Sequence, residues 1–303
     1  MKIVVIGSSN IDMVAQVDHL PAPGETVGDA FFMQSLGGKG ANQAVAAARL
    51  GGSVIFVTSL GNDMYANILK EHFQEEGITT NYILEDHNQP TGTALIFVAN
   101  NGENCIAVAP GANHSLSPEL IDHFSTVIDD ADIIVMQAEI PYITIKTIAL
   151  LAESKGKKVL FNPAPACLID AELMKAIGIL VVNEVEAAYV SGIDYNGNNL
   201  EEIAQSLMVA GAKNVVITLG SQGVYMKNER GSIRIPGYKV KAIDTIAAGD
   251  TFCGALAVTC AQKEIDEEAL RFANAAAAIA VTRSGAQPSI PTLEEVNTFI
   301  TQN

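Results

Sequence analysis

The sequence predicts an α/β protein, a doubly wound parallel sheet with helices on both faces and a small β-strand lid. Two observations lead to this fold class. Between residues 133 and 218, short apolar runs alternate regularly with helical segments, and repeated β–α order is typical of a parallel sheet covered on both sides. Nearer the N-terminus, extra strand-like segments interrupt this order. They indicate an insertion that forms a separate small unit beside the main sheet.

Composition limits the classes of partner and the location. The 303 residues carry a net charge of −16, which argues against nucleic acid or an anionic membrane as a partner. No apolar run approaches the roughly 20 residues of a membrane-spanning helix, and the first apolar run is too short for a signal peptide. The four cysteines form no Cys-x-x-Cys pair, so we expect reduced thiols and a cytoplasmic protein.

The chain opens with a β-branched run at residues 2–6, which is typical of a buried strand. A polar loop follows and contains Asn10 and Asp12. Ligands of parallel α/β sheets bind beyond this end of the strands, and an amide with a carboxylate suits hydroxyl recognition. From this loop alone, an Asx-turn is the simpler interpretation.

Two excursions are expected to form the lid. Their strand patterns cover residues 14–18, 30–34, 91–99 and 104–108. The last two of these runs flank an Asn-Asn-Gly turn, which is a hairpin signal. We therefore place lid insertions at approximately residues 12–37 and 90–108, within a single α/β domain of residues 1–303.

A glycine-rich segment, Gly37-Gly38-Lys39-Gly40, precedes a helix expected at residues 41–50. The segment is not a Walker phosphate loop, because Lys39 is followed by Gly40 and not by Ser or Thr. The glycines would let a small ligand touch the backbone, while Lys39 and Asn42 supply hydrogen-bond donors. A helix start with flexible glycines is the alternative.

The remaining elements alternate in order. Further strands are expected at residues 53–58, 133–137, 158–161, 179–182 and 214–218. Further helices are expected at residues 63–76, 142–154, 251–262, 265–282 and 293–300. Three consecutive strands end in polar or glycine-rich loops, which would share one sheet edge. The loop from Thr218 to Gly223 suits phosphate or nucleotide contacts, although a hairpin turn is its simpler interpretation.

The segment from Asp244 to Phe252 carries the clearest catalytic signal. We expect a strand at residues 238–243, a sharp turn at Gly249, and then a helix whose first backbone N–H groups form an anion site. Asp250 lies at the same place and could take a proton from a hydroxyl during phosphoryl transfer. A helix N-cap explains Asp250 about as well, but it explains neither Asp244 nor the bare Ala247-Ala248-Gly249 run.

These segments together resemble the ribokinase branch of the PfkB carbohydrate kinase family. Two signatures carry the resemblance, Gly37–Ala44 and Asp244–Phe252, supported by Asn10-Ile-Asp12 and Pro21–Thr26. The resemblance covers essentially the whole chain and implies a ribokinase-like, Rossmann-like fold. It also implies phosphorylation of the primary hydroxyl of D-ribose by ATP with Mg²⁺, activation by K⁺, and a homodimer formed through the lid.

The resemblance implies a role for individual residues. Asp250 would be the general base, and the amides of Ala247, Ala248, Gly249 and Asp250 would hold the transferring phosphoryl group. The residues implied to face the sugar are Asn10, Asp12, Gly38, Lys39, Asn42, Glu139 and Asp250. Those implied for ATP are Asn183, Glu186, Thr218, Gly220, Ser221, Gly223, Gly249 and Asn274, with Glu186 tied to Mg²⁺. Those implied for a monovalent cation are Asp244, Ile246, Ala280, Arg283, Gly285 and Ser289. Many family members carry glycine in place of Ala247.

Other functions remain open at this stage. A kinase for deoxyribose, adenosine or pseudouridine is the alternative within the family. A sugar-binding regulator without turnover is disfavoured, because both Asp250 and Gly249 are retained. A dinucleotide-dependent dehydrogenase is excluded, since no Gly-x-Gly-x-x-Gly follows the first strand.

Overall fold

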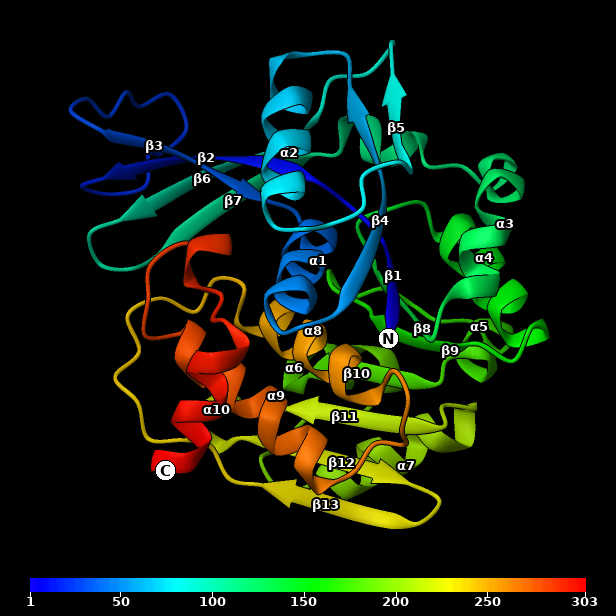
Figure 1. Ribbon diagram of the computed structural model, residues 1–303. Coiled ribbons are helices and arrows are strands. Elements are labelled where there is room, and N and C mark those ends of the chain that lie inside the picture. The colour runs from blue at the N-terminus through cyan, green and yellow to red at the C-terminus, as the bar shows by residue number, and fades with distance from the viewer.

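The computed structural model describes the backbone of residues 1–303 and all side chains except those of residues 120–123 (Figure 1). A nine-stranded sheet forms its centre, in the order β13-β12-β11-β10-β9-β8-β1-β4-β5. The strands from β11 to β5 run parallel to one another, and β12 and β13 are antiparallel at one edge. The predicted parallel α/β class is therefore confirmed.

The strands of this sheet are short and mostly apolar. Their bounds are β1 (Lys2–Ile6), β4 (Ser53–Gly61), β5 (Ile83–Asp86), β8 (Ile133–Gln137), β9 (Lys158–Asn162), β10 (Ile179–Asn183), β11 (Asn214–Thr218), β12 (Val224–Asn228) and β13 (Gly231–Ile235). Alternate residues of one strand enter different cores: Ile3 and Val5 of β1 pack on one face, and Val4 and Ile6 on the other. This follows from the two-residue side-chain period of a strand.

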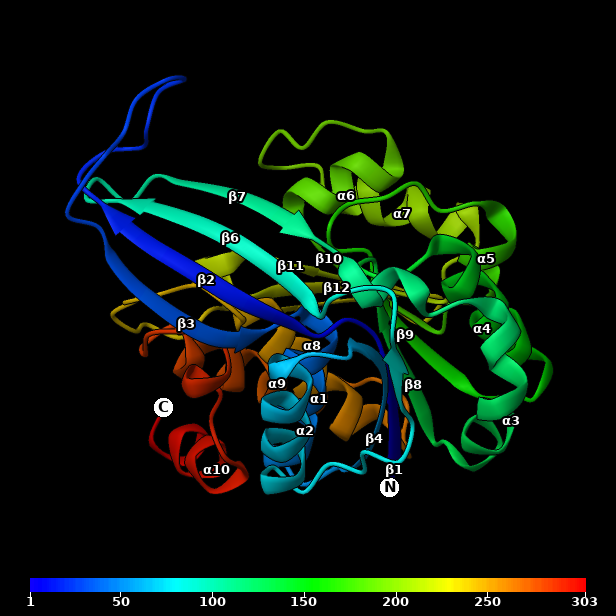
Figure 2. The same ribbon diagram turned by 90° about the horizontal axis from the view of Figure 1, so that it is seen from above.

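Helices form a layer on each face of the sheet (Figure 2). One layer contains α1 (Lys39–Arg49), α2 (Met64–Glu75), α8 (Ala248–Cys260), α9 (Glu267–Ala280) and α10 (Leu293–Gln302). The other contains α3 (Ile121–Asp130), α4 (Tyr142–Ser154), α5 (Ala171–Ala176), α6 (Glu184–Ser191) and α7 (Leu200–Ala210). Short 3₁₀ turns are η1 (Gly111–Ser115), η2 (Pro118–Leu120), η3 (Gly220–Gln222) and η4 (Gln287–Ser289). No helix in the part of the chain that the structure describes is long and apolar enough to cross a membrane.

Helices α1 and α8 approach each other closely because small residues line their contact. A Cβ atom added at Gly254 of α8 would lie 2.6 Å from the Cβ of Ala46 and 2.9 Å from the backbone nitrogen of Ala47, both on α1. Real Cβ atoms do not approach other atoms this closely, so glycine is required at this crossing. The crossing brings the start of α1 beside the start of α8.

A second sheet of four strands, in the order β3-β2-β6-β7, extends to one side of the molecule (Figures 1 and 2). Its strands are β2 (Asn10–Val17), β3 (Phe31–Gly37), β6 (Gly92–Ala99) and β7 (Asn104–Ala109). Asn10 and Asp12 lie on β2, where Asp12 is opposite Ser35 on one side and Ala94 on the other. The Asx-turn interpretation of these two residues is therefore wrong, because strand pairing continues through them.

Two local predictions near α8 are also wrong. Residues 238–243 are not a strand; the place beside β12 is taken by β13, which the sequence analysis missed. The sharp turn before α8 is made by Ala247, whose φ is +58°, while Gly249 lies inside the first turn of the helix. An alanine thus adopts the left-handed conformation that glycine adopts more readily.

Candidate active site

A cavity of about 420 Å³ lies between the four-stranded sheet and the carboxyl ends of the central strands. β9, β10 and β11 end there at Asn162, Asn183 and Thr218, and apolar side chains of β6 and β7 line the side that faces them. The predicted sugar-facing residues all line this one cavity, namely Asn10, Asp12, Gly38, Lys39, Asn42, Glu139 and Asp250.

Asp250 is 6% exposed and accepts hydrogen bonds on both carboxylate oxygens. Asn42 Nδ2 donates to Oδ2 over 3.0 Å, and Gln43 Nε2 donates to Oδ1 over 3.0 Å. The N-cap position of α8 is occupied by Ala247, with no side-chain cap. The N-cap interpretation of Asp250 is therefore wrong: its partners are two amides of α1, more than 200 positions away in sequence.

Gln43 is a site residue that the sequence analysis missed. It is fully buried on α1, next to Asn42, in a run of alanines and glycines. The signal in the sequence is that Gln43 follows Asn42 in a helix whose other side chains are mostly small and apolar. A long polar side chain in such a run must find a buried polar partner, and here that partner is Asp250.

The start of α8 offers backbone N–H groups to the cavity. Among the described residues, the N–H groups of Ala247, Gly249 and Asp250 have no intramolecular acceptor, and that of Ala248 donates to the carbonyl of Thr245 over 3.3 Å. The left-handed backbone of Ala247 starts the helix abruptly. Unpaired N–H groups at the positive end of a helix dipole favour a bound anion.

Of the glycines at the start of α1, Gly38 lines the cavity and Gly40 packs closely against another backbone segment. Gly38 lines the cavity with φ +88°. A Cβ added at Gly40 would lie 2.5 Å from the backbone nitrogen of Ser8, so the helix start can rest on the end of β1 only with glycine there. Glu139 fixes the same start, because its Oε2 accepts from the Lys39 N–H over 2.9 Å.

The charges around the sugar-facing residues perturb one another. Burial, followed by the charges of Glu139 and Asp250, raises the pKa of Asp12 to about 6. The charge of Asp250 raises the pKa of Lys39 against the opposing effect of burial. A half-buried acid with a raised pKa inside a cavity is typical of a functional site.

Two asparagines show how the cavity could receive hydroxyl groups. Asn42 Oδ1 is buried and has no hydrogen-bond partner among the described residues, which a hydroxyl donor from a ligand would satisfy. Asn10 is held by Asn113, whose Nδ2 donates to Asn10 Oδ1 over 2.8 Å. Asn113 was not predicted; it also accepts from the Ser9 N–H over 2.9 Å and so fixes the connection between β1 and β2.

A second cavity of about 320 Å³ adjoins the first and shares Thr218, Thr245 and Gly249 with it. Six of the residues implied for ATP line it, namely Thr218, Gly220, Ser221, Gly223, Gly249 and Asn274. Its apolar wall was not predicted and consists of Tyr238, Val240, Ala242, Phe252, Ala277, Ala278 and Val281. The hairpin interpretation of residues 218–223 is correct, since β11 and β12 are antiparallel, and the same turn lines the cavity.

Asn183 and Glu186 lie in the first cavity, near Asp250. They form a capping box on α6: Asn183 Oδ1 accepts from the Glu186 N–H over 2.8 Å, and Glu186 Oε2 accepts from the Asn183 N–H over 2.9 Å. Burial raises the pKa of Glu186, while the Asn183 N–H and Lys39 act against it. Glu186 Oε1 accepts no hydrogen bond within the described residues, so this oxygen is free to meet a ligand.

The predicted cation-site residues lie on two loops that Asp244 joins. Asp244 Oδ1 accepts from the Ile246 N–H and Oδ2 from the Gly285 N–H, both over 2.9 Å. The carbonyls of Ile246, Gly285 and Ser289 receive no intramolecular hydrogen bond within the described residues. The Ala280 carbonyl already accepts from the Arg283 N–H over 3.1 Å, and the Arg283 side chain pairs with Glu295.

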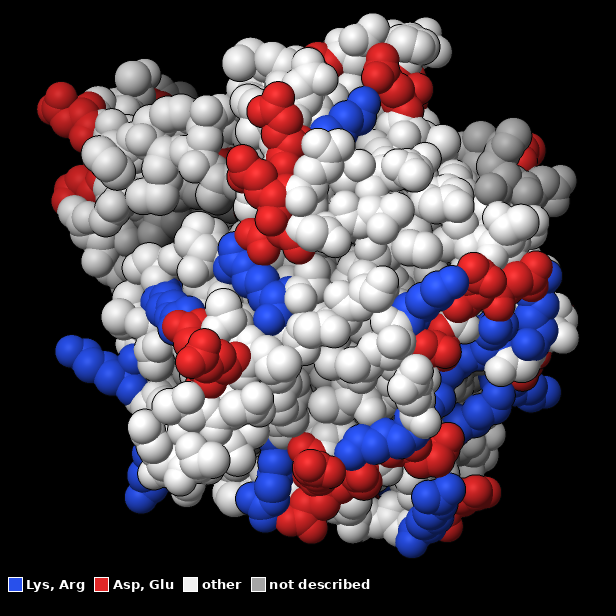
Figure 3. Space-filling model, in the orientation of Figure 1, with Lys and Arg blue, Asp and Glu red and all other residues white. Residues whose placement is uncertain are grey.

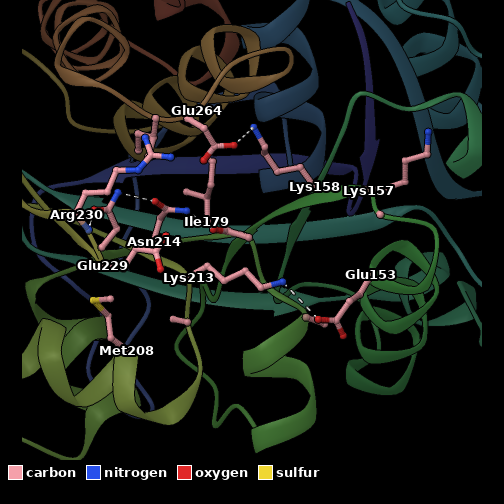
Figure 4. Close-up of a pocket in the computed structure, with 16 residues that line it drawn as sticks. Glu153, Lys157, Lys158, Ile179, Met208, Lys213, Asn214, Glu229, Arg230 and Glu264 are labelled. Atoms are coloured by element: carbon pink, nitrogen blue, oxygen red, sulfur yellow. Dashed lines mark hydrogen bonds and ion pairs between the residues drawn. The ribbon is translucent and has the colours of Figure 1, made fainter.

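A larger cavity, of about 600 Å³, lies at the opposite sheet edge, where β9, β10 and β11 begin (Figure 4). None of the predicted site residues lines it. Lys158 donates to the carbonyls of Cys260 and Lys263 over 2.8 Å, at the C-terminal end of α8. Lys213 pairs with Glu153 over 3.4 Å. Lys158 and Lys213 thus contact neighbouring carbonyls and acids. We place the candidate active site in the two cavities beside Asp250.

The chain is similar to known carbohydrate kinases over nearly its whole length. The model of the pfkB family of carbohydrate kinases matches residues 1–293. A ribokinase of Haemophilus influenzae is 41% identical over 98% of both chains. The crystal structure of a ribokinase from Thermotoga maritima is 43% identical over 99% of both chains, with a TM-score of 0.90. The structure of an Arabidopsis thaliana ribokinase complexed with ribose and ATP is 32% identical over 98% of both chains, with a TM-score of 0.91.

Proposed function

The chain belongs to the pfkB family of carbohydrate kinases, and we propose that it transfers the γ-phosphoryl group of ATP to the primary hydroxyl of D-ribose. Relatives named ribokinases match nearly the full chain. The observation that carries the proposal is the juxtaposition of three features in one cavity. These are the carboxylate of Asp250, the unpaired acceptor Asn42 Oδ1, and the free N–H groups at the start of α8.

Asp250 and the N–H groups act in the chemical step, whereas Asn42 would bind the sugar. Asp250 takes the proton of the sugar hydroxyl, whose oxygen then attacks the γ-phosphorus in line. The bond from that phosphorus to the β–γ bridging oxygen breaks, and its electron pair leaves with ADP. The N–H groups of Ala247, Gly249 and Asp250 stabilise the negative charge of the transferring group.

We assign the two substrates to different cavities. The sugar would lie in the first, with hydroxyls on Asn10, Asp12 and Asn42. The adenine would lie against the apolar wall of the second, between Tyr238 and Val281. The phosphates would then cross the shared boundary at Gly249, which would bring the γ-phosphoryl group to Asp250.

Two cations fit the residues present. Magnesium, when bound with ATP, neutralises phosphate charge and usually keeps several waters. A cation that keeps its waters requires few protein ligands, and the free carboxylate oxygen of Glu186 could supply one. The described part of the chain contains no group of three or more His, Cys, Asp or Glu that could hold a metal by itself. The unpaired carbonyls of Ile246, Gly285 and Ser289 suit K⁺, which prefers neutral oxygens.

We also propose that the four-stranded sheet acts as the lid, closes the sugar cavity against water, and pairs with the same sheet of a second copy. Ala94, Ile96 and Val98 of β6 face the cavity, so Leu95 and Phe97 must point to the opposite face of the sheet. Leu95 and Phe97 are 47% and 38% exposed. Exposed apolar patches of this kind mark interaction sites.

The reduced state of the cysteines supports action in the cytoplasm. All four cysteines are unpaired, and Cys105 is exposed on the lid sheet. Exposed thiols persist in reducing compartments, and ATP is supplied there.

A panel of sugars and nucleosides with ATP and Mg²⁺ tests the proposed substrate. We expect D-ribose to give the highest kcat/KM, with ³¹P and ¹³C NMR placing the phosphate on the 5-oxygen. Deoxyribose, adenosine and pseudouridine are the discriminating competitors. A kcat/KM for any of them about tenfold above that for ribose would reassign the substrate.

A further inference from the structure

A chain of hydrogen-bonded amide side chains, Gln43, Gln137 and Asn162, leads from Oδ1 of Asp250. Gln43 and Gln137 do not line the cavity, whereas Asn162 does. Gln43 Nε2 donates to Asp250 Oδ1 over 3.0 Å and to Asn162 Oδ1 over 3.3 Å. Gln137 Nε2 donates to Gln43 Oε1 over 2.7 Å. Gln43 and Gln137 are fully buried, so this chain is shielded from solvent.

The direction of each hydrogen bond is fixed by chemistry. An ionised carboxylate can only accept, so Gln43 must turn its NH₂ group towards Asp250. Its carbonyl oxygen therefore faces Gln137, which must present NH₂ in turn. Asn162 donates its own NH₂ to the carbonyl of Val181 over 2.9 Å, which leaves its oxygen for Gln43. No amide of the chain can flip without breaking a bond.

The fold makes room for this chain through a glycine. A Cβ added at Gly7 would lie 2.1 Å from Gln137 Oε1. Gln137 ends β8, and Asn162 lies beside it at the end of β9. Two strand ends and one helix thus hold a single donor against one oxygen of Asp250.

We infer that Gln43 is a positioning residue that gives the two oxygens of Asp250 different tasks: Oδ1 is anchored, and Oδ2 takes the proton. Asn42, which contacts Oδ2, lines the sugar cavity, whereas Gln43 does not. We therefore expect a substrate hydroxyl to approach Asp250 from the side of Oδ2. This inference rests on the proposed function, because it assigns the atom that receives the proton.

The proton balance of the step follows. The sugar O–H bond breaks, its proton forms a bond to Asp250 Oδ2, and its electron pair remains on the attacking oxygen. Gln43 stays a donor to Oδ1 before and after transfer, so the chain of amides need not rearrange. Its bond is stronger to the ionised form than to the protonated form, which keeps Asp250 ready to accept a proton.

Kinetics of Gln43→Met and Gln43→Glu test the inference. Methionine has a similar length but no donor, so we expect kcat to fall about 10- to 100-fold, the effect of one hydrogen bond to a charged group. The KM values for ribose and ATP should stay within about threefold of wild type. The acid limb of the kcat profile should move up by about one pH unit in Gln43→Met, and further in Gln43→Glu, where two carboxylates compete for protons.

Val45→Ala is the matched control. Val45 is fully buried on the same helix but lines neither cavity. Its truncation should lower Tm and leave the acid limb in place. If Gln43→Met keeps kcat within threefold of wild type with an unmoved acid limb, the positioning role is wrong.

A readout without turnover separates this inference from the substrate assignment. The ¹³C carboxyl resonance of Asp250, identified by its loss in Asp250→Asn, is titrated in the sugar-free wild type and in Gln43→Met. We expect its midpoint at higher pH in Gln43→Met. Equal midpoints would overturn the role of Gln43 whatever the substrate, while failure to phosphorylate ribose with shifted midpoints would overturn only the substrate.

Discussion

To act as the proposed general base, Asp250 would have to be buried, ionised and reachable by a hydroxyl at the same time. Burial alone disfavours the charged form of an acid. The structure compensates with hydrogen-bond donors, Asn42 and Gln43, one on each oxygen. Neutral donors can do this without closing the cavity, whereas a directly paired Lys or Arg would occupy the place of the sugar hydroxyl.

Replacement of Asp250 by asparagine separates a base from a structural residue. Asn42 can turn its unpaired Oδ1 towards the new amide, so the fold and both substrates should still be accommodated. The proton acceptor is lost, which typically costs about 10²- to 10⁴-fold in rate. We expect this fall in kcat in single-turnover measurements, with Tm close to wild type.

Asp266→Asn is the control for this substitution. Asp266 is the N-cap of α9 and accepts from the Ala269 N–H, a task that asparagine performs equally well. It should leave turnover unchanged. More than a tenth of wild-type kcat in Asp250→Asn, with chemistry rate-limiting, would contradict the general-base role.

Asp12 predicts opposite pH trends for stability and for sugar binding. Its pKa is raised from 3.8 to about 6, first by burial, so the folded state binds this proton more tightly than the unfolded state. The stabilisation is complete below about pH 4 and is lost as pH rises through 6. Asp12→Asn should therefore be more stable than wild type at pH 8, by at most about 3 kcal/mol, and no more stable at pH 4.

Urea unfolding at the two pH values measures this difference. Asp29→Asn is the control, because Asp29 is exposed in the same insertion and its left-handed backbone suits asparagine. The KM of wild type for ribose should rise below pH 6, as the carboxylate that accepts sugar hydroxyls becomes protonated. A stability gain that is equal at both pH values would show that the charge of Asp12 is not its cause.

At the level of single residues, the sequence predicted residues that line the two cavities and missed those that support them from behind. Asp12, Asn42 and Asp250 stand in recognisable signatures. Gln43 and Asn113 act through contacts with residues distant in sequence, and no local pattern reveals which buried amide meets which carboxylate. Their positions depend on how helices and strands pack.

Among the elements, α8 joins several parts of the site. Its start supplies free N–H groups and Asp250, its middle packs on α1 through Gly254, and Lys158 caps the carbonyl of Cys260 at its end. The prediction of this helix was correct, but residues 238–243 before it are not a strand. An alternating pattern does not make a strand when the neighbouring strand already has a partner, here β13.

The loop before α8 predicts activation by potassium. Asp244 accepts one hydrogen bond from Ile246 in this loop and one from Gly285 in the neighbouring loop. A cation among the nearby free carbonyls would fix the N–H groups proposed to face the phosphoryl group. We expect higher kcat in potassium chloride than in tetramethylammonium chloride at equal ionic strength. Asp244→Asn turns one acceptor into a donor, so it should lower both kcat and the apparent affinity for potassium. Equal rates in the two salts would rule out this role.

For the whole molecule, the active site lies between two sheets of different character. The central sheet is covered by helices on both faces, and this part of the molecule carries most of the proposed catalytic groups. The lid sheet contributes Asn10, Asp12 and an apolar cover. Its two insertions, residues 10–37 and 90–109, contain no Lys or Arg, and Figure 3 shows few charges over this part of the surface.

The exposed face of the lid predicts a dimer in solution. Phe32, Leu95 and Phe97 lie on the face turned away from the cavity, and Phe32 is 57% exposed. A neutral partner with the same apolar face would cover these side chains, and a second copy provides one. We expect sedimentation equilibrium to give twice the chain mass at micromolar concentrations. The double substitution Leu95→Glu with Phe97→Glu should give monomers, because it places like charges in the contact.

The dimer would also affect catalysis, because the lid holds Asp12 over the sugar. Monomers with a mobile lid should bind ribose more weakly while the KM for ATP changes little, since the second cavity contains no lid residue. Val209→Glu is the control: Val209 is 79% exposed on α7, away from the lid, and an acid there should alter neither mass nor KM. A wild-type protein that is monomeric at these concentrations, or a double variant that remains dimeric, would contradict pairing through this face.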